Sequence, residues 1–128
     1  MKLLKAIILG VVVSVSAVGV TSVAHAESDP GRVAYKPAEA IDLVLTKIKA
    51  AQEAIAADKS ADDIVTAIKA AKDASKEINA NDKVDIARIR ANVHLSKAIG
   101  MAKEKDNKLA SEHLKTAEAA FVDLKKLL

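Results

Sequence analysis

The stretch that decides the fold spans residues 83–127, with the sequence KVDIARIRANVHLSKAIGMAKEKDNKLASEHLKTAEAAFVDLKKL. Apolar residues recur in it at intervals of three and four, which is the spacing of one face of an α-helix. The polar run Lys105-Asp106-Asn107 interrupts this spacing once. A short break of this kind joins antiparallel neighbours, so the segment predicts a helical hairpin.

The chain upstream of this hairpin has the same helical character. After Pro37 there is no further proline and a single glycine, Gly100, while good helix formers dominate the composition. Lys36-Pro37 suits a helix start, and Ser60 followed three residues later by Asp63 is a capping pattern. Nothing predicts a strand. The apolar spacing predicts four helices in all, at about 38–57, 61–78, 83–104 and 108–127.

The connections between these helices are short, so successive helices are expected to be antiparallel neighbours. The predicted fold class is therefore all-α, an up-down-up-down four-helix bundle with a core rich in small residues. The predicted core consists of Ile41, Val44, Ile48, Ala51 and Ile55 with Leu45 beside them, then Ile64, Ala67, Ile68, Ala71, Ala74 and Ile78, then Val84, Ala87, Ala91, Leu95, Ala98 and Ala102, and finally Leu109, Leu114, Ala117, Ala120, Phe121, Leu124 and Leu128.

Three β-branched residues do not fit this core. Ile86, Ile89 and Val93 lie on the side of the third helix that faces away from its alanine stripe. One interpretation, the simpler of the two, is that the core face of this helix is rotated and the row is partly core. The other is that the row is exposed and mediates self-association or binds a partner. Spacing of i, i+3 and i+7 is compatible with both.

The first 26 residues have the order of a secretory signal peptide. Lys2 and Lys5 form a basic start, residues 6–20 are apolar except for two serines, and Ala24-His25-Ala26 is a small-x-small cleavage site. We expect a periplasmic protein without stable membrane association after cleavage. An uncleaved anchor is the competing interpretation, since spanning a bilayer takes at least about 17 residues. The predicted parts are a signal peptide over 1–26, a polar leader over 27–37 and the bundle over 38–128.

Composition excludes several classes of protein. The 128 residues include no Cys, which rules out disulfides, Cys-based zinc sites, iron–sulfur clusters and covalently attached haem. Removal of Lys2 and Lys5 with the signal peptide, which has no acidic residue, lowers the net charge from +3 to +1. That balance, with one Tyr, one Phe and no Trp, argues against a nucleic-acid partner. No catalytic motif is present, so we expect a protein that is not an enzyme.

His94 and His113 are the most informative polar residues. Measured from Lys105, His94 is 11 residues before the turn and His113 is 8 after it. At ~1.5 Å per residue their heights differ by about 4–5 Å, so imidazoles on adjacent helices can meet. Met101 lies two turns beyond His94 on the same edge. Two imidazoles with a thioether or carboxylate suit copper, nickel or zinc. The alternative is a core histidine that is hydrogen-bonded to a neighbour such as Ser96, Ser111 or Thr116.

The order His94-Leu95-x-x-Ala98-Ile99, a charged turn, and then Ala110-Ser111-Glu112-His113 and Ala117 resembles the periplasmic small metal-binding protein family. The resemblance implies a signal-bearing four-helix bundle that binds copper and other divalent metals, with both histidines on histidines of the family pattern. Residues 49–74 resemble the family's first hairpin with a shorter turn. The histidine-like positions there hold alanine, so the resemblance implies one metal site at most; these positions are Ala50, Ala57, Ala67 and Ala74.

The segment from Ala98 to Phe121 also resembles b-type cytochrome bundles. The positions that correspond to that family's axial methionine and histidine hold Leu45 and Val122, so haem is not expected. Two functions remain. The first is a periplasmic bundle that binds or buffers copper, nickel or zinc. The second is a non-enzymatic interaction or stress protein without metal that acts through an exposed apolar helix face.

Overall fold

The structure is a computed structural model that describes residues 34–128. The predicted signal peptide and cleavage site lie outside the described residues, as does most of the polar leader. Two one-turn 3-10 helices, η1 (Ser75–Glu77) and η2 (Lys125–Leu127), extend the second and fourth α-helices. The described residues contain no strand, and their α-helices are α2 (Pro37–Ala56), α3 (Ala61–Ala74), α4 (Asp82–Lys103) and α5 (Asn107–Leu124).

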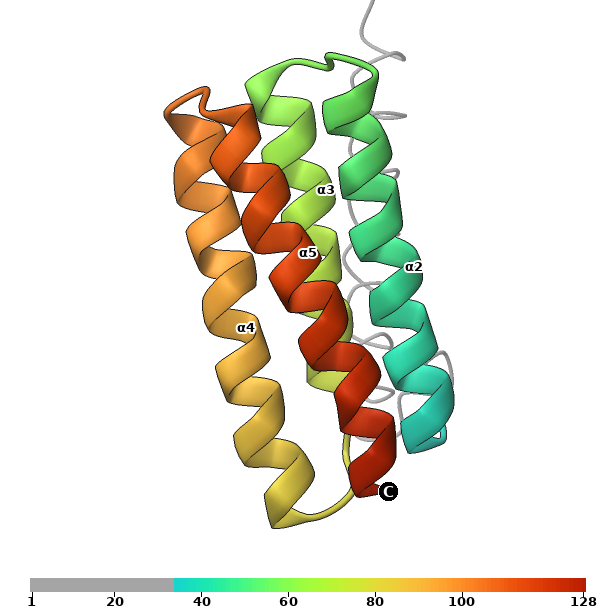
Figure 1. The fold of residues 1–128 in the computed structure, drawn as a ribbon. Helices are drawn as coiled ribbons and strands as arrows, with labels where there is room; N and C mark the ends of the chain where they lie inside the picture. Colours follow the sequence, from blue (N-terminus) through green and yellow to red (C-terminus); the bar gives the residue numbers. More distant parts are fainter. Residues whose placement is uncertain (1–33) are drawn as a thin grey trace, which may run out of the picture. The chain divides into compact units, whose positions relative to one another are not determined.

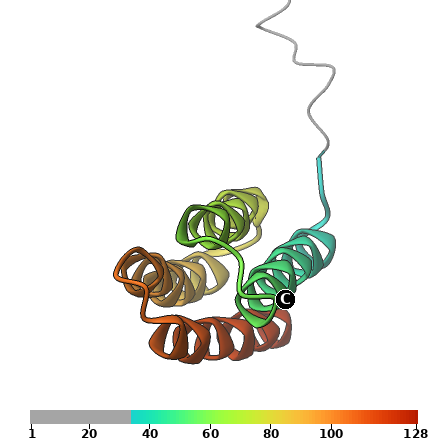
Figure 2. The same ribbon diagram turned by 90° about the horizontal axis from the view of Figure 1, so that it is seen from above.

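The four α-helices alternate in direction along the chain (Figure 1). Each packs against the helices that precede and follow it, and α2 packs against α5 to close the ring (Figure 2). The predicted all-α four-helix bundle is confirmed. Within residues 34–128 no helix is both long enough and apolar enough to span a bilayer.

Local side-chain chemistry sets the helix starts. Pro37 opens α2, as its fixed φ and missing amide proton favour. The other three helices begin after a residue whose side-chain oxygen accepts from the amide three positions later, which satisfies an amide that has no partner inside the helix. These caps are Ser60, Asn81 and Asp106, at 3.1, 3.0 and 3.0 Å.

The α2–α3 and α4–α5 turns end their first helices in the same way. A single residue adopts the left-handed region, with φ 53° at Asp58 and 61° at Lys105. The amide that follows it donates to the carbonyl five residues back, at 3.0 Å in the first turn and 2.9 Å in the second. This is the Schellman arrangement, which satisfies carbonyls at a helix end.

The helix ends agree with the sequence prediction to within a few residues, and α3 differs most. It ends at Ala74 rather than near residue 78, and the chain tightens into η1. The hydroxyl of Ser75 donates to the carbonyl of Lys72 at 2.6 Å and lies 3.0 Å from Oδ1 of Asn92 on α4. Competition from a serine hydroxyl for backbone acceptors is a reason for a helix to end. Ile78, beyond the helix, is still buried.

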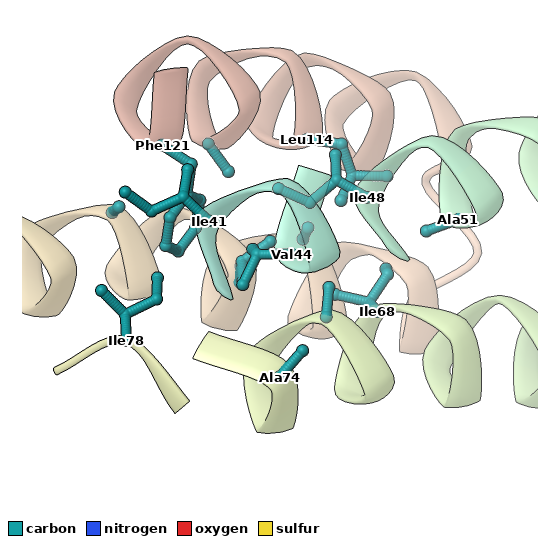
Figure 3. Close-up of a cluster of buried hydrophobic side chains, with 14 of the residues drawn as sticks. Ile41, Val44, Ile48, Ala51, Ile68, Ala74, Ile78, Leu114 and Phe121 are labelled. Carbon is teal, nitrogen blue, oxygen red and sulfur yellow. The ribbon is translucent and has the colours of Figure 1, made fainter. Parts of the chain in front are cut away.

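The core fills the centre of the bundle and contains most of the predicted residues. Figure 3 shows Phe121 and Leu114 of α5 directed toward α2. Leu109 and Leu128 were expected in the core, but they are 39% and 52% exposed. Leu109 lies in the first turn of α5 and Leu128 follows η2, so both lie near the ends of the bundle. Predicted residues that are only partly buried against the core are Leu45, Ile55, Ala67, Ala87 and Ala120.

The β-branched row of α4 is exposed. Ile86, Ile89 and Val93 are 52%, 54% and 47% exposed, so the interpretation of this row as partly core is wrong. The predicted alanine stripe, with Ala91 and Ala98, faces inward instead. Small residues there let α4 approach its neighbours closely, and the β-branched residues are left on the opposite face.

Candidate functional site

Helices α4 and α5, which make the most extensive helix–helix contact of the bundle, bring the two histidines together. The ring centroids of His94 on α4 and His113 on α5 are 6.2 Å apart, and the ring planes are tilted by 30°. The expectation that these imidazoles meet is therefore correct for their placement. Their role as ligands stays a prediction.

The two imidazoles lie at the boundary between the core and the surface. Each is partly buried and directly precedes a leucine, Leu95 or Leu114, that is fully buried. Because the leucines hold α4 and α5 in register, the backbone positions of the two rings are fixed by core packing. The site is thus carried by rigid helices and not by a loop.

One nitrogen of this pair is in an unfavourable position. Nδ1 of His94 is buried, and no hydrogen-bond partner for it exists among the described residues. A buried polar atom without a partner costs about 1–3 kcal/mol, so such atoms are rare unless they serve a purpose. This nitrogen is an unused donor or acceptor on a ring that lies next to a second imidazole.

The alternative role, a core histidine satisfied by a nearby hydroxyl, gains no support from the neighbouring polar side chains. The hydroxyl of Ser96 accepts from Nζ of Lys72 on α3 at 2.9 Å. The hydroxyl of Thr116 donates to the carbonyl of Glu112 at 3.1 Å. Nδ1 of His94 has no hydrogen-bond partner among the described residues, so neither hydroxyl satisfies it.

The separation of the rings is compatible with a shared ion. With metal–nitrogen bonds of ~2.0–2.1 Å, the centroid of a coordinating imidazole lies about 3.2 Å from the ion, so two such rings have centroids about 5–6.4 Å apart. The observed 6.2 Å falls at the wide end of this range.

The described residues contain no cluster of three or more His, Asp or Glu side chains that could hold a metal. The protein therefore offers two imidazoles at this place and no closed cage. Met101, the predicted third ligand, is partly buried and packs against the core. Its participation as a thioether ligand stays a prediction.

Sequence analysis missed the polar links that hold α4 against α3 next to His94. Asn92 and Ser96 flank His94 on α4, and they bind Ser75 of η1 and Lys72 of α3 at 3.0 and 2.9 Å. The signal was the pair of small polar residues Asn92 and Ser96, one turn apart on α4, which the search for an apolar stripe passes over. These links fix the rotation of α4 at the height of His94.

Comparison of the chain with known protein families, with curated proteins and with solved structures finds no match. The resemblance to the small metal-binding family therefore remains an interpretation of residues 94–117.

Proposed function

We propose that this protein is a small metal-binding or metal-buffering bundle that holds one copper, nickel or zinc ion between His94 and His113. The observation that carries the proposal is the pair of imidazoles, 6.2 Å apart by centroid, with a buried and unpartnered Nδ1 on His94. Coordination would give that nitrogen the partner that the protein does not supply. The resemblance to the periplasmic small metal-binding family supports the same residues.

Two protein ligands suit a buffering role better than a structural one. Structural zinc sites are closed by four protein ligands, whereas sites with fewer ligands leave positions for water or an exchanging partner. Imidazole is a good ligand for copper, nickel and zinc, and a thioether from Met101 would favour Cu(I). We therefore propose an ion that is held with moderate affinity and released readily.

The proposed compartment is the periplasm, on the strength of the basic, apolar and small-residue order of residues 1–26. Cleavage after Ala26 would leave a chain that begins at Glu27. The intact mass of protein recovered from the cell envelope tests this, since retention of residues 1–26 in a membrane fraction contradicts it.

Calorimetric titration of the purified protein with Cu(II), Ni(II) and Zn(II) tests the proposed site. We expect about one equivalent to bind, and to bind more weakly at about pH 5 than at about pH 7, because protons compete with the metal for imidazole nitrogen. The metal should also raise the melting temperature, since it binds the folded arrangement and not the open chain.

Variants separate ligation from packing. His94→Ala and His113→Ala should each remove most of the metal-induced rise in melting temperature, and the double variant should add little, as expected for two ligands of one site. Met101→Leu keeps the volume and removes the thioether, so it tests the third ligand alone. The proposal would be contradicted if stoichiometric copper, nickel and zinc left the wild-type melting temperature unchanged near neutral pH.

A second candidate function has an observation of its own. The exposed row of Ile86, Ile89 and Val93 favours a non-enzymatic interaction or stress protein that acts through α4 without metal. In that case His113→Ala should destabilise the metal-free protein through lost packing, and His94→Ala should do little. Neither variant should then change the response to metal.

A further inference from the structure

The outer face of α4 carries an apolar row without a partner in the described part of the chain. Ile86, Ile89 and Val93 are each about half exposed. Of the eight large apolar residues that are exposed within residues 34–128, three lie in this row. The two on α5, Leu109 and Val122, are 13 residues apart and form no row.

Opposite charges stand at the two ends of this row. Asp82 is one helical turn before Ile86, and Lys97 is one turn after Val93; both are exposed. Intervals of four, three, four and four residues place all five on one line along the helix. This line along α4 is thus acidic at one end, apolar in the middle and basic at the other end.

Gly100 continues the same line one turn further on. A glycine inside a helix makes the helix less stable than an alanine would, so its presence calls for an explanation. A Cβ atom at Gly100 would meet nothing within 4 Å, so packing inside this chain does not require the glycine. Gly100 is partly exposed and lies beyond the last charged residue of the line.

We propose that this face of α4 pairs with the same face of a second copy of the chain, with the two helices antiparallel around Ile89. A two-fold axis near Ile89 places Ile86 opposite Val93 of the second copy and Asp82 opposite Lys97 of the second copy. Each end of the row then meets the opposite charge, and the interface is self-complementary, as two-fold symmetry requires. A parallel pair would place acid against acid and base against base.

The size of the row sets the strength of the dimer. Three half-exposed side chains offer far less than the ~800 Å² per partner of a standard stable interface. The dimer is therefore weak and reversible, with a dissociation constant in the micromolar range or above. This inference is independent of the metal site, and its measurements are made with a chelator present, so the two proposals fail separately.

Sedimentation velocity of the protein tests the pairing. The full coding sequence is expressed, and the protein is purified with whatever processing the cell has carried out. Samples are measured from about 5 to about 500 µM. We expect a concentration-dependent change from monomer to dimer. Ile89→Lys should weaken the dimer at least tenfold, whereas the matched control Val122→Lys on α5 should leave it unchanged. Circular dichroism checks the fold, and Val93→Lys is the second variant if Ile89→Lys unfolds.

Charge exchange tests the antiparallel register. Asp82→Lys and Lys97→Asp should each weaken the dimer several-fold, because each places like charges opposite one another. The double variant should restore it. In a parallel pair each residue would face its own copy. All three variants would then keep like charges opposite one another, and the double variant would restore nothing.

Cross-linking tests the position of the axis. The chain has no Cys, so Ile89→Cys introduces a single thiol. It should form an intermolecular disulfide much faster than Val122→Cys, because residues near a two-fold axis come within the ~5.5–6 Å between Cα atoms that a disulfide needs. The proposal is overturned if the wild-type protein is a monomer at every concentration. It is also overturned if Ile89→Lys leaves the dimer as strong as in the wild type. Failure of the double charge variant to restore the dimer overturns the antiparallel register.

Discussion

Helices α2 and α4 differ in where most of their isoleucine and valine side chains lie. In α2, Ile41 and Ile48 point into the core and are fully buried. In α4, the inward face carries three alanines with Val84 and Leu95, and Ile86 and Ile89 face outward, half exposed. The difference shows that apolar periodicity locates a helix but does not decide which apolar face is inside. Large side chains from one helix fill the core. A neighbouring helix can then contribute small residues to the core and carry its own large residues on its outer face.

The second hairpin illustrates the consequence. Its buried alanines, Ala98 and Ala102 on α4 and Ala110 and Ala117 on α5, are consistent with the extensive contact between these helices. That contact brings the imidazoles of the two helices together. The first hairpin, α2–α3, has isoleucine and valine in the core and no histidine. Both hairpins thus contribute large side chains to the core, and the candidate chemistry lies in the second hairpin alone.

The largest effect is expected at Phe121, which supplies bulk that the alanines of α4 do not. The ring is fully buried, so Phe121→Ala should cost about 3–5 kcal/mol of unfolding free energy. Val122→Ala, at the exposed neighbour, should change it by less than about 0.5 kcal/mol. Chemical denaturation measures both. An unmoved midpoint for Phe121→Ala would mean that the core does not depend on the ring.

The contrast between α2 and α4 can be tested with one type of substitution. Ile48→Ala in α2 opens a cavity and should cost about 2–5 kcal/mol. Ile89→Ala in α4 removes an exposed side chain and should change monomer stability by less than about 0.5 kcal/mol. Denaturation at low protein concentration measures the monomer. Equal costs for the two variants would remove the distinction between the faces.

These residues also show how far the sequence leads. The four helices, the cap at Ser60 and the alanine stripe were predictable because periodicity and capping are local properties. The exposure of Leu109 and of the Ile86 row was not, because it depends on how far the core extends and on which face the neighbouring helices fill. The meeting of His94 with His113 followed from counting residues from a turn. The unpartnered Nδ1 did not, because it depends on rotamers and on the partners of Ser96 and Thr116.

Overpacking the alanine stripe should have a smaller effect than emptying the core. Ala98→Leu places three extra carbons where α4 meets its neighbours, and such insertions cost about 1–3 kcal/mol. The control is Ala119→Leu on α5, an exposed position where the larger side chain should be tolerated. Thermal melts of both variants make the comparison. A stable Ala98→Leu protein would show that α4 is not held close by its small residues.

The smallest effect on stability is expected at the residues that follow the ends of α2 and α4. Asp58 after α2 and Lys105 after α4 both adopt the left-handed region. That region costs most residues about 1–2 kcal/mol, and aspartate tolerates it better because its side chain can hydrogen-bond locally. Glycine removes the strain but loses roughly 0.5–1 kcal/mol through the greater freedom of the unfolded chain. Lys105→Gly should therefore raise the unfolding free energy by about 0.5–1 kcal/mol, and Asp58→Gly by less, with both read from denaturation midpoints. A fall in stability for Lys105→Gly would mean that contacts of the exposed lysine outweigh its backbone strain.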